Sequence, residues 1–279
     1  MSNLEIIPDW RKGKALYENH PLLPRSTRML ICGSSGDGKS VLLLRMLLCS
    51  ILDYDVIFLI TPSIDQPEYQ IFIEGLNAGL LPSHILGIFK EQDNIYNAMS
   101  AVKSIAERLK CKQQVAVITS KNVDAIDSPE ELRMRANTCY RSLHPDADKN
   151  YVCKVFIILD DAMTFKQTKI DALFTFGRTF SENIVYLVQD YYGYSKRGCR
   201  SNVNAWILIR QTQDELKRIF NKIDKDKNNY ESFVSLSSAA WAKDQGFLLI
   251  TRDQGRTLYT DGEQLLNEIK NKSNKLYPS

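Results

Sequence analysis

Gly33-Ser-Ser-Gly-Asp-Gly-Lys-Ser40 is the stretch that decides the fold of this chain. It matches the pattern GxxxxGK[ST], in which backbone N–H groups of a glycine-rich loop surround phosphate oxygens. The apolar residues 29–32 before it predict a strand, and residues 41–48 after it predict a helix whose amino end faces the phosphates. A ligand-free turn is the alternative, which the agreement of loop and flanking elements disfavours.

Each residue type in this loop has an expected role. Lys39 is expected to reach the β- and γ-phosphates of a nucleotide, and the Ser40 hydroxyl to bind Mg²⁺. Asp37 would repel phosphates if it faced them, so we expect its side chain to point outward. The predicted nucleotide-binding residues are Gly33, Ser34, Ser35, Gly36, Asp37, Gly38, Lys39, Ser40 and Val41.

Composition favours one large domain and gives little information about partners. The 279 residues are 44% hydrophobic, which is enough for one elaborated core, and the net charge of +3 is too small to indicate nucleic-acid binding. Six scattered cysteines without a CxxC pair indicate a reducing compartment, and no zinc site is indicated. The chain shows no leader-like start and no apolar run of roughly 18 residues, so we expect an intracellular protein without a transmembrane segment.

Short apolar runs predict the strands of a layered α/β fold. They are residues 28–32, 55–60, 115–119, 155–159, 184–188, 205–209 and 246–251. Most are continuously apolar, as in central parallel strands covered on both faces, and residues 96–110 and 166–178 are long enough for crossover helices. The sequence predicts a three-layer α/β/α sandwich with a mostly parallel sheet. Residues 1–27 are expected as an arm, 28–266 as the domain with a polar insertion near 120–150, and 267–279 as a basic tail.

Two carboxylates and a glutamine complete the predicted site. Asp160 and Asp161 follow the apolar run 155–159, and a phosphate loop needs an acidic partner for Mg²⁺. We expect Asp160 to meet the metal ion and Asp161 to orient a water molecule. Gln189 closes the run that starts at residue 184. In ATPases of the additional-strand class such a polar sensor strand lies between the other two, although a polar residue that merely ends a strand is the alternative.

The chain resembles the viral genome-packaging ATPases of the FtsK/HerA superfamily, which occur in nucleocytoplasmic large DNA viruses, virophages and Polinton-like elements. Four segments carry the resemblance: residues 33–40, residues 58–63 with Glu68 and Tyr69, residues 157–161, and residues 176–204. Two positions depart from the pattern. Asp161 stands where many members have glutamate, and Thr179 stands where histidine is expected.

The resemblance implies a P-loop NTPase of the additional-strand, RecA-like type that hydrolyses ATP with Mg²⁺. It further implies a ring of five or six subunits that drives double-stranded DNA into a preformed capsid, in the host cytoplasm or viral factory or with the virion. A capsid-vertex or membrane protein of the virion is a candidate partner. In such rings an arginine of the neighbouring subunit completes the site. Arg178 and Arg200 are the candidates, with Arg178 preferred, and a surface or helix-capping role is the alternative for both.

Several interpretations stay open at this point. Residues 191–200 combine tyrosines with basic residues, which fits a DNA-contacting loop or a subunit interface equally well. Another DNA pump or helicase of the same fold, and a scaffold that binds ATP only to assemble, are alternative functions. A nucleotide kinase or GTPase is disfavoured because the chain lacks an NKxD sequence and Gln189 would have no function there.

Overall fold

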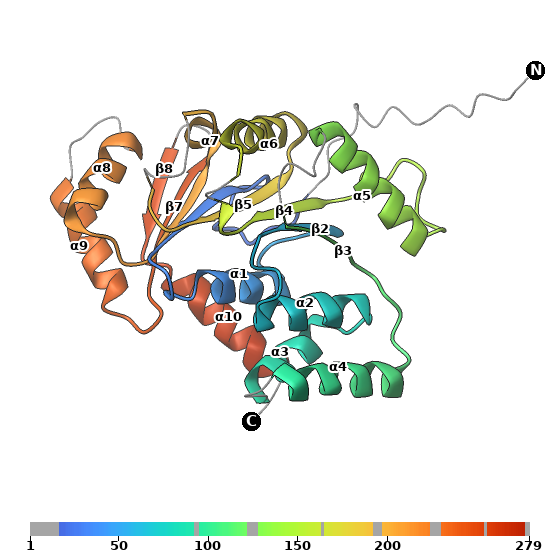
Figure 1. The fold of residues 1–279 in the computed structure, drawn as a ribbon. Helices are drawn as coiled ribbons and strands as arrows, with labels where there is room; N and C mark the ends of the chain where they lie inside the picture. Colours follow the sequence, from blue (N-terminus) through green and yellow to red (C-terminus); the bar gives the residue numbers. More distant parts are fainter. Residues whose placement is uncertain are drawn as a thin grey trace, which may run out of the picture.

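The computed structural model describes residues 17–91, 95–121, 128–162, 165–191, 197–223, 230–253 and 256–276. Its centre is an eight-stranded sheet in the order β3-β2-β4-β5-β1-β6-β7-β8 (Figure 1). The strands are β1 (Arg28–Cys32), β2 (Val56–Ile60), β3 (Ala116–Ser120), β4 (Val155–Leu159), β5 (Asn183–Val188), β6 (Ala205–Leu208), β7 (Leu248–Asp253) and β8 (Arg256–Thr260). The seven predicted strands are confirmed to within two residues at each end, and β8 was not predicted.

The strand order confirms the additional-strand arrangement. The six strands from β3 to β6 pair in parallel, whereas β7 and β8 are antiparallel additions at one edge. Strand β5 lies between β1, which leads into the phosphate loop, and β4, which leads into Asp160 and Asp161. Because neighbouring parallel strands have their carboxyl ends on the same side of the sheet, the loop, the acidic pair and Gln189 meet at these carboxyl ends.

Ten helices within the described residues cover the two faces of the sheet, as Figure 1 shows. One face carries α1 (Lys39–Leu48), α2 (Pro67–Asn77), α3 (Pro82–Glu91), α4 (Ile95–Leu109) and α10 (Glu263–Leu276). The other face carries α5 (Pro129–Leu143), α6 (Gln167–Phe180), α7 (Arg197–Asn202), α8 (Gln213–Ile223) and α9 (Tyr230–Trp241). The predicted three-layer sandwich is therefore confirmed.

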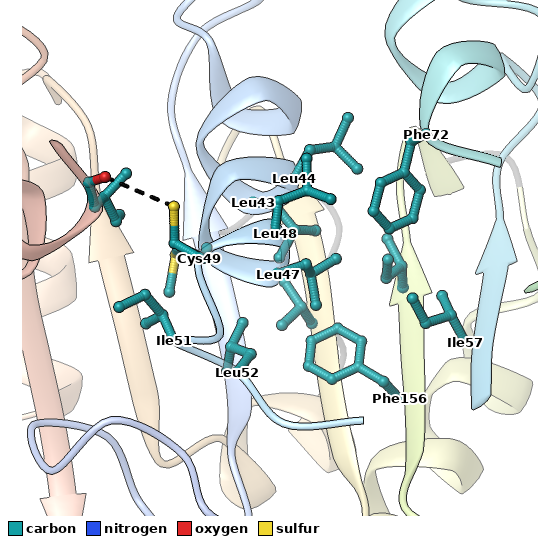
Figure 2. Packing of buried hydrophobic residues seen from close by; sticks show 14 of the residues in the cluster. Leu43, Leu44, Leu47, Leu48, Cys49, Ile51, Leu52, Ile57, Phe72 and Phe156 are labelled. Carbon is teal, nitrogen blue, oxygen red and sulfur yellow. Dashed lines mark hydrogen bonds between the residues drawn. The ribbon is translucent and has the colours of Figure 1, made fainter. Parts of the chain in front are cut away.

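Alternate side chains of each strand enter two separate cores. In β1, Met29 and Ile31 pack with the first set of helices, whereas Leu30 and Cys32 pack with the second. Figure 2 shows the first core, in which Leu47 of α1 packs near Phe156 of β4. Burying one such side chain contributes roughly 1.5–3 kcal/mol. Helix α1 is therefore held firmly beneath the phosphate loop that it follows.

The ends of the described chain pack against this body. Residues 267–276, expected as a basic tail, form the part of α10 that follows its first turn, because Leu265, Leu266 and Ile269 give the helix a buried apolar face. The Cys49 thiol donates to the Ile269 carbonyl over 3.6 Å, the dashed line in Figure 2. Residues 17–27 of the expected arm also pack on the domain, while residues 1–16 lie outside the described residues. The domain boundaries themselves stay predictions.

Helix α5 lies within the expected polar insertion and covers the sheet. Ser128 caps it by accepting a hydrogen bond from the Glu131 N–H at 3.1 Å, and Pro129 occupies the first turn. On its buried side, Arg133 forms an ion pair with Glu182 at 3.4 Å. The Tyr17 hydroxyl donates to Glu182 over 2.5 Å. Burial raises the pKa of Glu182 to about 7, against the opposing effects of Arg133 and Tyr17.

All six cysteines are free. Within the part of the chain that the structure describes, no helix is both long and apolar enough to cross a membrane.

Candidate active site

The phosphate loop connects β1 to α1 in a conformation that exposes its backbone. Gly36 and Gly38 have φ angles of 84° and 76°, in the left-handed region that glycine enters without strain. A Cβ atom at either position would meet nothing within 4 Å, so the space above the loop is open. Helix α1 begins at Lys39, and its first N–H groups have no partner within the helix. The loop can therefore receive an anion.

Asp160 faces the loop directly. It follows β4 and is buried, with 8% of its surface exposed, and its Oδ2 accepts a hydrogen bond from the Ser40 hydroxyl over 3.2 Å. Burial raises the pKa of the carboxyl, while the hydrogen bonds from Tyr69 and Ser40 act in the opposite direction. The structure therefore joins the two residues predicted to bind the metal ion, although they are far apart in the sequence.

Tyr69 is a second partner of this carboxylate. Its ring is fully buried in the first turn of α2, and its hydroxyl donates to Asp160 Oδ2 over 2.5 Å. Burial, and next the charge of Asp160, raise the pKa of Tyr69, so it stays protonated as a donor. Tyr69 thereby fixes the orientation of the carboxylate.

Asp161 is exposed beside the loop. Its Oδ2 accepts a hydrogen bond from the Ser63 hydroxyl over 3.4 Å, so the segment after β2 positions it. Its φ of 51° lies in the left-handed region, where aspartate and asparagine are found more often than other residues with a side chain. The carboxylate can therefore accept a proton from a water molecule placed above the loop.

A hollow of about 450 Å³ brings these residues together, and we call it the phosphate hollow. Its floor and walls come from the loop, from the turn after β4, from the start of α2 and from the end of β5. The lining residues are Ser35, Gly36, Gly38, Lys39, Ser40, Val41, Gln66, Glu68, Asp160, Asp161, Leu187 and Gln189. The structure thus brings Gln189 to the same hollow as the loop and the acidic pair.

The Lys39 ammonium folds onto the loop. It donates to the carbonyl oxygens of Gly33 and Ser34, each over 2.8 Å. Burial lowers its pKa, and the nearby carboxylates, Asp160 first, oppose that shift. Both carbonyl contacts are hydrogen bonds that an incoming phosphate oxygen can replace.

The side chain of Asp37 is directed out of the phosphate hollow. It lines a neighbouring hollow on the other side of the loop and does not line the phosphate hollow. A Cβ atom built on Gly33 would lie 3.0 Å from Asp37 Oδ2, which shows that the side chain folds back over the start of the loop.

Sequence reasoning assigned no role to three residues that the structure places at this site. Tyr69 binds Asp160, while Gln66 and Glu68 line the phosphate hollow at the start of α2. Glu68 and Tyr69 were part of the resemblance. The signal that could have found them is their place just after β2, which ends at the same edge as β4.

The two arginine candidates lie elsewhere. Arg178 is exposed near the carboxyl end of α6, beside Arg25 and Arg28, at the edge where β1 and β5 begin. Arg28 has its pKa lowered to about 10 by burial and, to a lesser degree, by Arg178. Arg200 is half-buried in α7, whose Cys199 N–H donates to Asp171 of α6 over 2.6 Å. Neither arginine lines the phosphate hollow of its own chain.

Comparison with known proteins adds one family. Residues 14–124 match the family model described as Poxvirus A32 protein. The match spans less than half of the chain and runs from before β1 through β3, so it includes the loop, α1 and α2. Over these residues it confirms a resemblance to a viral protein family, as the sequence predicted. No curated protein matches the chain.

Two solved structures are distant likenesses of this chain. The DNA-packaging ATPase B204 from Sulfolobus turreted icosahedral virus is 16% identical with a TM-score of 0.48, and the match covers 83% of this chain and 95% of B204. A DnaB-like replicative helicase is 12% identical with a TM-score of 0.43, over 84% of this chain and 54% of the helicase. The fold assignment therefore rests on the strand order of this chain.

Proposed function

We propose that this chain is the ATPase subunit of a motor that moves double-stranded DNA into a viral capsid. The observation that carries the proposal is the phosphate hollow, in which the loop, the Ser40–Asp160 hydrogen bond of 3.2 Å and Gln189 meet at one edge of the sheet. The family match over residues 14–124 supports a viral ATPase of this type. A cell infected by the virus is the proposed location.

The oxygen atoms at the loop fit Mg²⁺. The Ser40 hydroxyl and the Asp160 carboxylate are hard oxygen donors, already within hydrogen-bond distance of one another. No group of three or more His, Cys, Asp or Glu residues that could hold a metal ion occurs among the described residues. Two protein oxygens fit an ion that takes its other ligands from nucleotide phosphates and water. Bound with ATP, Mg²⁺ would neutralise charge on the phosphates.

The chain's own residues supply the remaining functions. Lys39 would leave the carbonyls of Gly33 and Ser34 and stabilise negative charge on the transferred phosphoryl group. Asp161, exposed and held by Ser63, would accept the proton of the attacking water. Gln189 follows β5, the strand between β4 and β1, and would respond to whether the γ-phosphate is present.

The ring is part of the proposal. In the described residues no arginine lines the phosphate hollow, so a cation from outside the subunit would complete it. Arg178 is exposed near the amino ends of β1 and β5, whereas Asp160 follows the carboxyl end of β4. Arg178 can therefore face a neighbouring subunit but not the site of its own chain. This placement favours Arg178 over the half-buried Arg200 as the residue that acts on the neighbour.

The DNA contact stays a prediction from the sequence. Of the basic and aromatic segment 191–200, residues 192–196 lie outside the described residues. Tyr191 is buried and Cys199 is packed against the second core, so the segment is anchored at both ends.

Phosphate release from ATP, measured with and without double-stranded DNA, tests the proposal. We expect turnover that DNA stimulates, and a loss of about 100-fold or more in Lys39→Ala, because one stabiliser of transition-state charge contributes about that much. Lys103→Ala, which removes an exposed lysine of α4, is the matched control. A protein that binds ATP without turnover under either condition would be the assembly scaffold instead, and equal turnover in Lys39→Ala would contradict the site.

A further inference from the structure

A second hollow adjoins the phosphate loop on the side away from Asp160. Its volume is about 270 Å³, just below the range of roughly 300–1,000 Å³ for pockets that hold a whole ligand. Gly36, Gly38 and Val41 line both this hollow and the phosphate hollow. The two spaces therefore meet across the glycine backbone, where no Cβ atom intervenes. A molecule bound by its phosphates on one side can extend into the other.

The lining of this second hollow has the character of a site for a flat aromatic ring. Leu42 of α1, Ile209 after β6, and Leu266 and Ile269 of α10 supply apolar surface. Polar and charged residues also line it, namely Asp37, Arg45, Gln245 and Lys270. Apolar walls with a few placed polar groups are the common form of small-ligand sites, because the walls bury the ring and the polar groups bind its edge.

Three parts of the chain that are distant in sequence are tied together around this space. The Arg45 guanidinium donates to Gln245 Oε1 over 3.3 Å, which joins α1 to the turn before β7. Lys243 of that turn forms ion pairs with Asp261 at 2.6 Å and Glu263 at 2.5 Å, at the start of α10. Figure 1 shows α10 crossing directly beside α1. The walls of the hollow are thus part of the packed fold.

We infer that this hollow, which we call the base hollow, binds the purine base of the nucleotide, so that the C-terminal helix α10 is part of the ATP site. The inference rests on the proposed function and extends it to a subsite. It also explains how Asp37 can contribute to binding. A carboxylate in the base hollow can accept a hydrogen bond from an amino group of the base, whereas in the phosphate hollow it would repel the ligand.

Photolabelling with 8-azido-ATP locates the base directly. We expect the label in residues 41–45, at Ile209, in the turn at Gln245 or in residues 266–270, and we expect excess ATP or inorganic tripolyphosphate to suppress it. A label that ATP suppresses but that lies in other segments, such as residues 63–70, would overturn the inference.

Affinity measurements separate the base from the phosphates, because tripolyphosphate has the three linked phosphates of ATP without its ribose and base. Gln245 has a φ of 56°, so Gln245→Gly keeps the backbone conformation and removes only the side chain. We expect the variant to bind ATP about 3- to 10-fold more weakly, the loss of one hydrogen bond, and to bind tripolyphosphate normally. Gln264→Ala, which removes an exposed glutamine of α10 outside the base hollow, is the matched control and should change neither affinity.

The outcomes are distinct. Equal losses for ATP and tripolyphosphate in Gln245→Gly would mean that the residue acts through the loop, and would overturn the inference. A wild-type protein that binds neither ligand would contradict the proposed function itself. Normal tripolyphosphate binding with a base labelled elsewhere would leave the ATPase proposal standing and remove the base hollow from it.

Discussion

Replacing Tyr69 with phenylalanine removes one hydroxyl and keeps the buried ring. The hydroxyl donates to Asp160 Oδ2 over 2.5 Å, on the carboxylate that we propose as a metal ligand. Without it Asp160 keeps the hydrogen bond from Ser40 at 3.2 Å and becomes less firmly oriented. We therefore expect a weaker response to Mg²⁺ rather than a loss of the fold.

The size of the effect follows from the burial of the bond. A hydrogen bond to a charged group contributes about 1.5–3 kcal/mol, which corresponds to roughly 10- to 150-fold in an equilibrium constant. Losing a partner that orients a metal ligand typically lowers metal affinity about 10- to 100-fold. We expect the Mg²⁺ concentration for half-maximal turnover to rise in Tyr69→Phe by about 10- to 100-fold.

Two assays and a matched variant test this expectation. Turnover is measured against Mg²⁺ concentration, and ATP binding is measured with and without Mg²⁺, so that the second readout does not depend on catalysis. Tyr54→Phe is the control, because Tyr54 also donates its hydroxyl in the core, to the Leu47 carbonyl over 3.4 Å, but outside the phosphate hollow. An unchanged Mg²⁺ requirement in a folded Tyr69→Phe protein would refute the orienting role of Tyr69.

Three further predictions concern the acidic residues, the neighbouring subunit and stability. Asp161→Asn should still bind ATP but lose turnover by roughly 100-fold, while Glu68→Gln should lose less; the reverse ranking would assign water activation to Glu68. Arg178→Ala subunits and Asp161→Asn subunits, each inactive alone, should regain turnover when they are mixed in one ring. Arg25→Ala is the matched control for the loss of an exposed arginine. If rings shown to be mixed regain no turnover, Arg178 does not act on the neighbouring subunit. Because the pKa of Glu182 is raised from 4.5 to about 7, the folded chain holds its proton more tightly than the unfolded chain. The contribution of Glu182 to the free energy of unfolding should therefore be present below pH 4.5 and fall by up to about 3 kcal/mol as the pH rises through 7. Denaturant titrations at several pH values should show this fall in the wild-type protein and not in Glu182→Gln.

Local patterns in the sequence predicted most of the sheet and the centre of the site. Strands that are buried on both faces are continuously apolar, so β1, β2, β4 and β5 stand out, and the loop has a specific pattern. Strand β8 was not predicted, because its sequence, Arg-Thr-Leu-Tyr-Thr, is mostly polar and it is an edge strand that pairs with β7 alone. Helix α10 was not predicted, because its lysines gave the segment the composition of a basic tail although three of its apolar residues have helical spacing.

The contacts around Asp160 could not be derived in the same way. Tyr69 lies 91 residues before Asp160 in the sequence, and only the parallel pairing of β2 with β4 brings the start of α2 to the turn after β4. The base hollow has the same origin, since α1, the turn at Gln245 and α10 meet only in the folded chain. Arrangements of this kind depend on tertiary packing, which local periodicity does not contain.

The backbone at residue 161 bears on which acidic side chain can stand there. With φ at 51°, this position accommodates aspartate more readily than glutamate, whose longer side chain cannot bond locally to the main chain in the same manner. The backbone conformation therefore gives a physical reason for aspartate at a position where the resemblance led us to expect glutamate. An exchange to glutamate would lengthen the reach of the carboxylate and, in the same step, strain the turn that aims it.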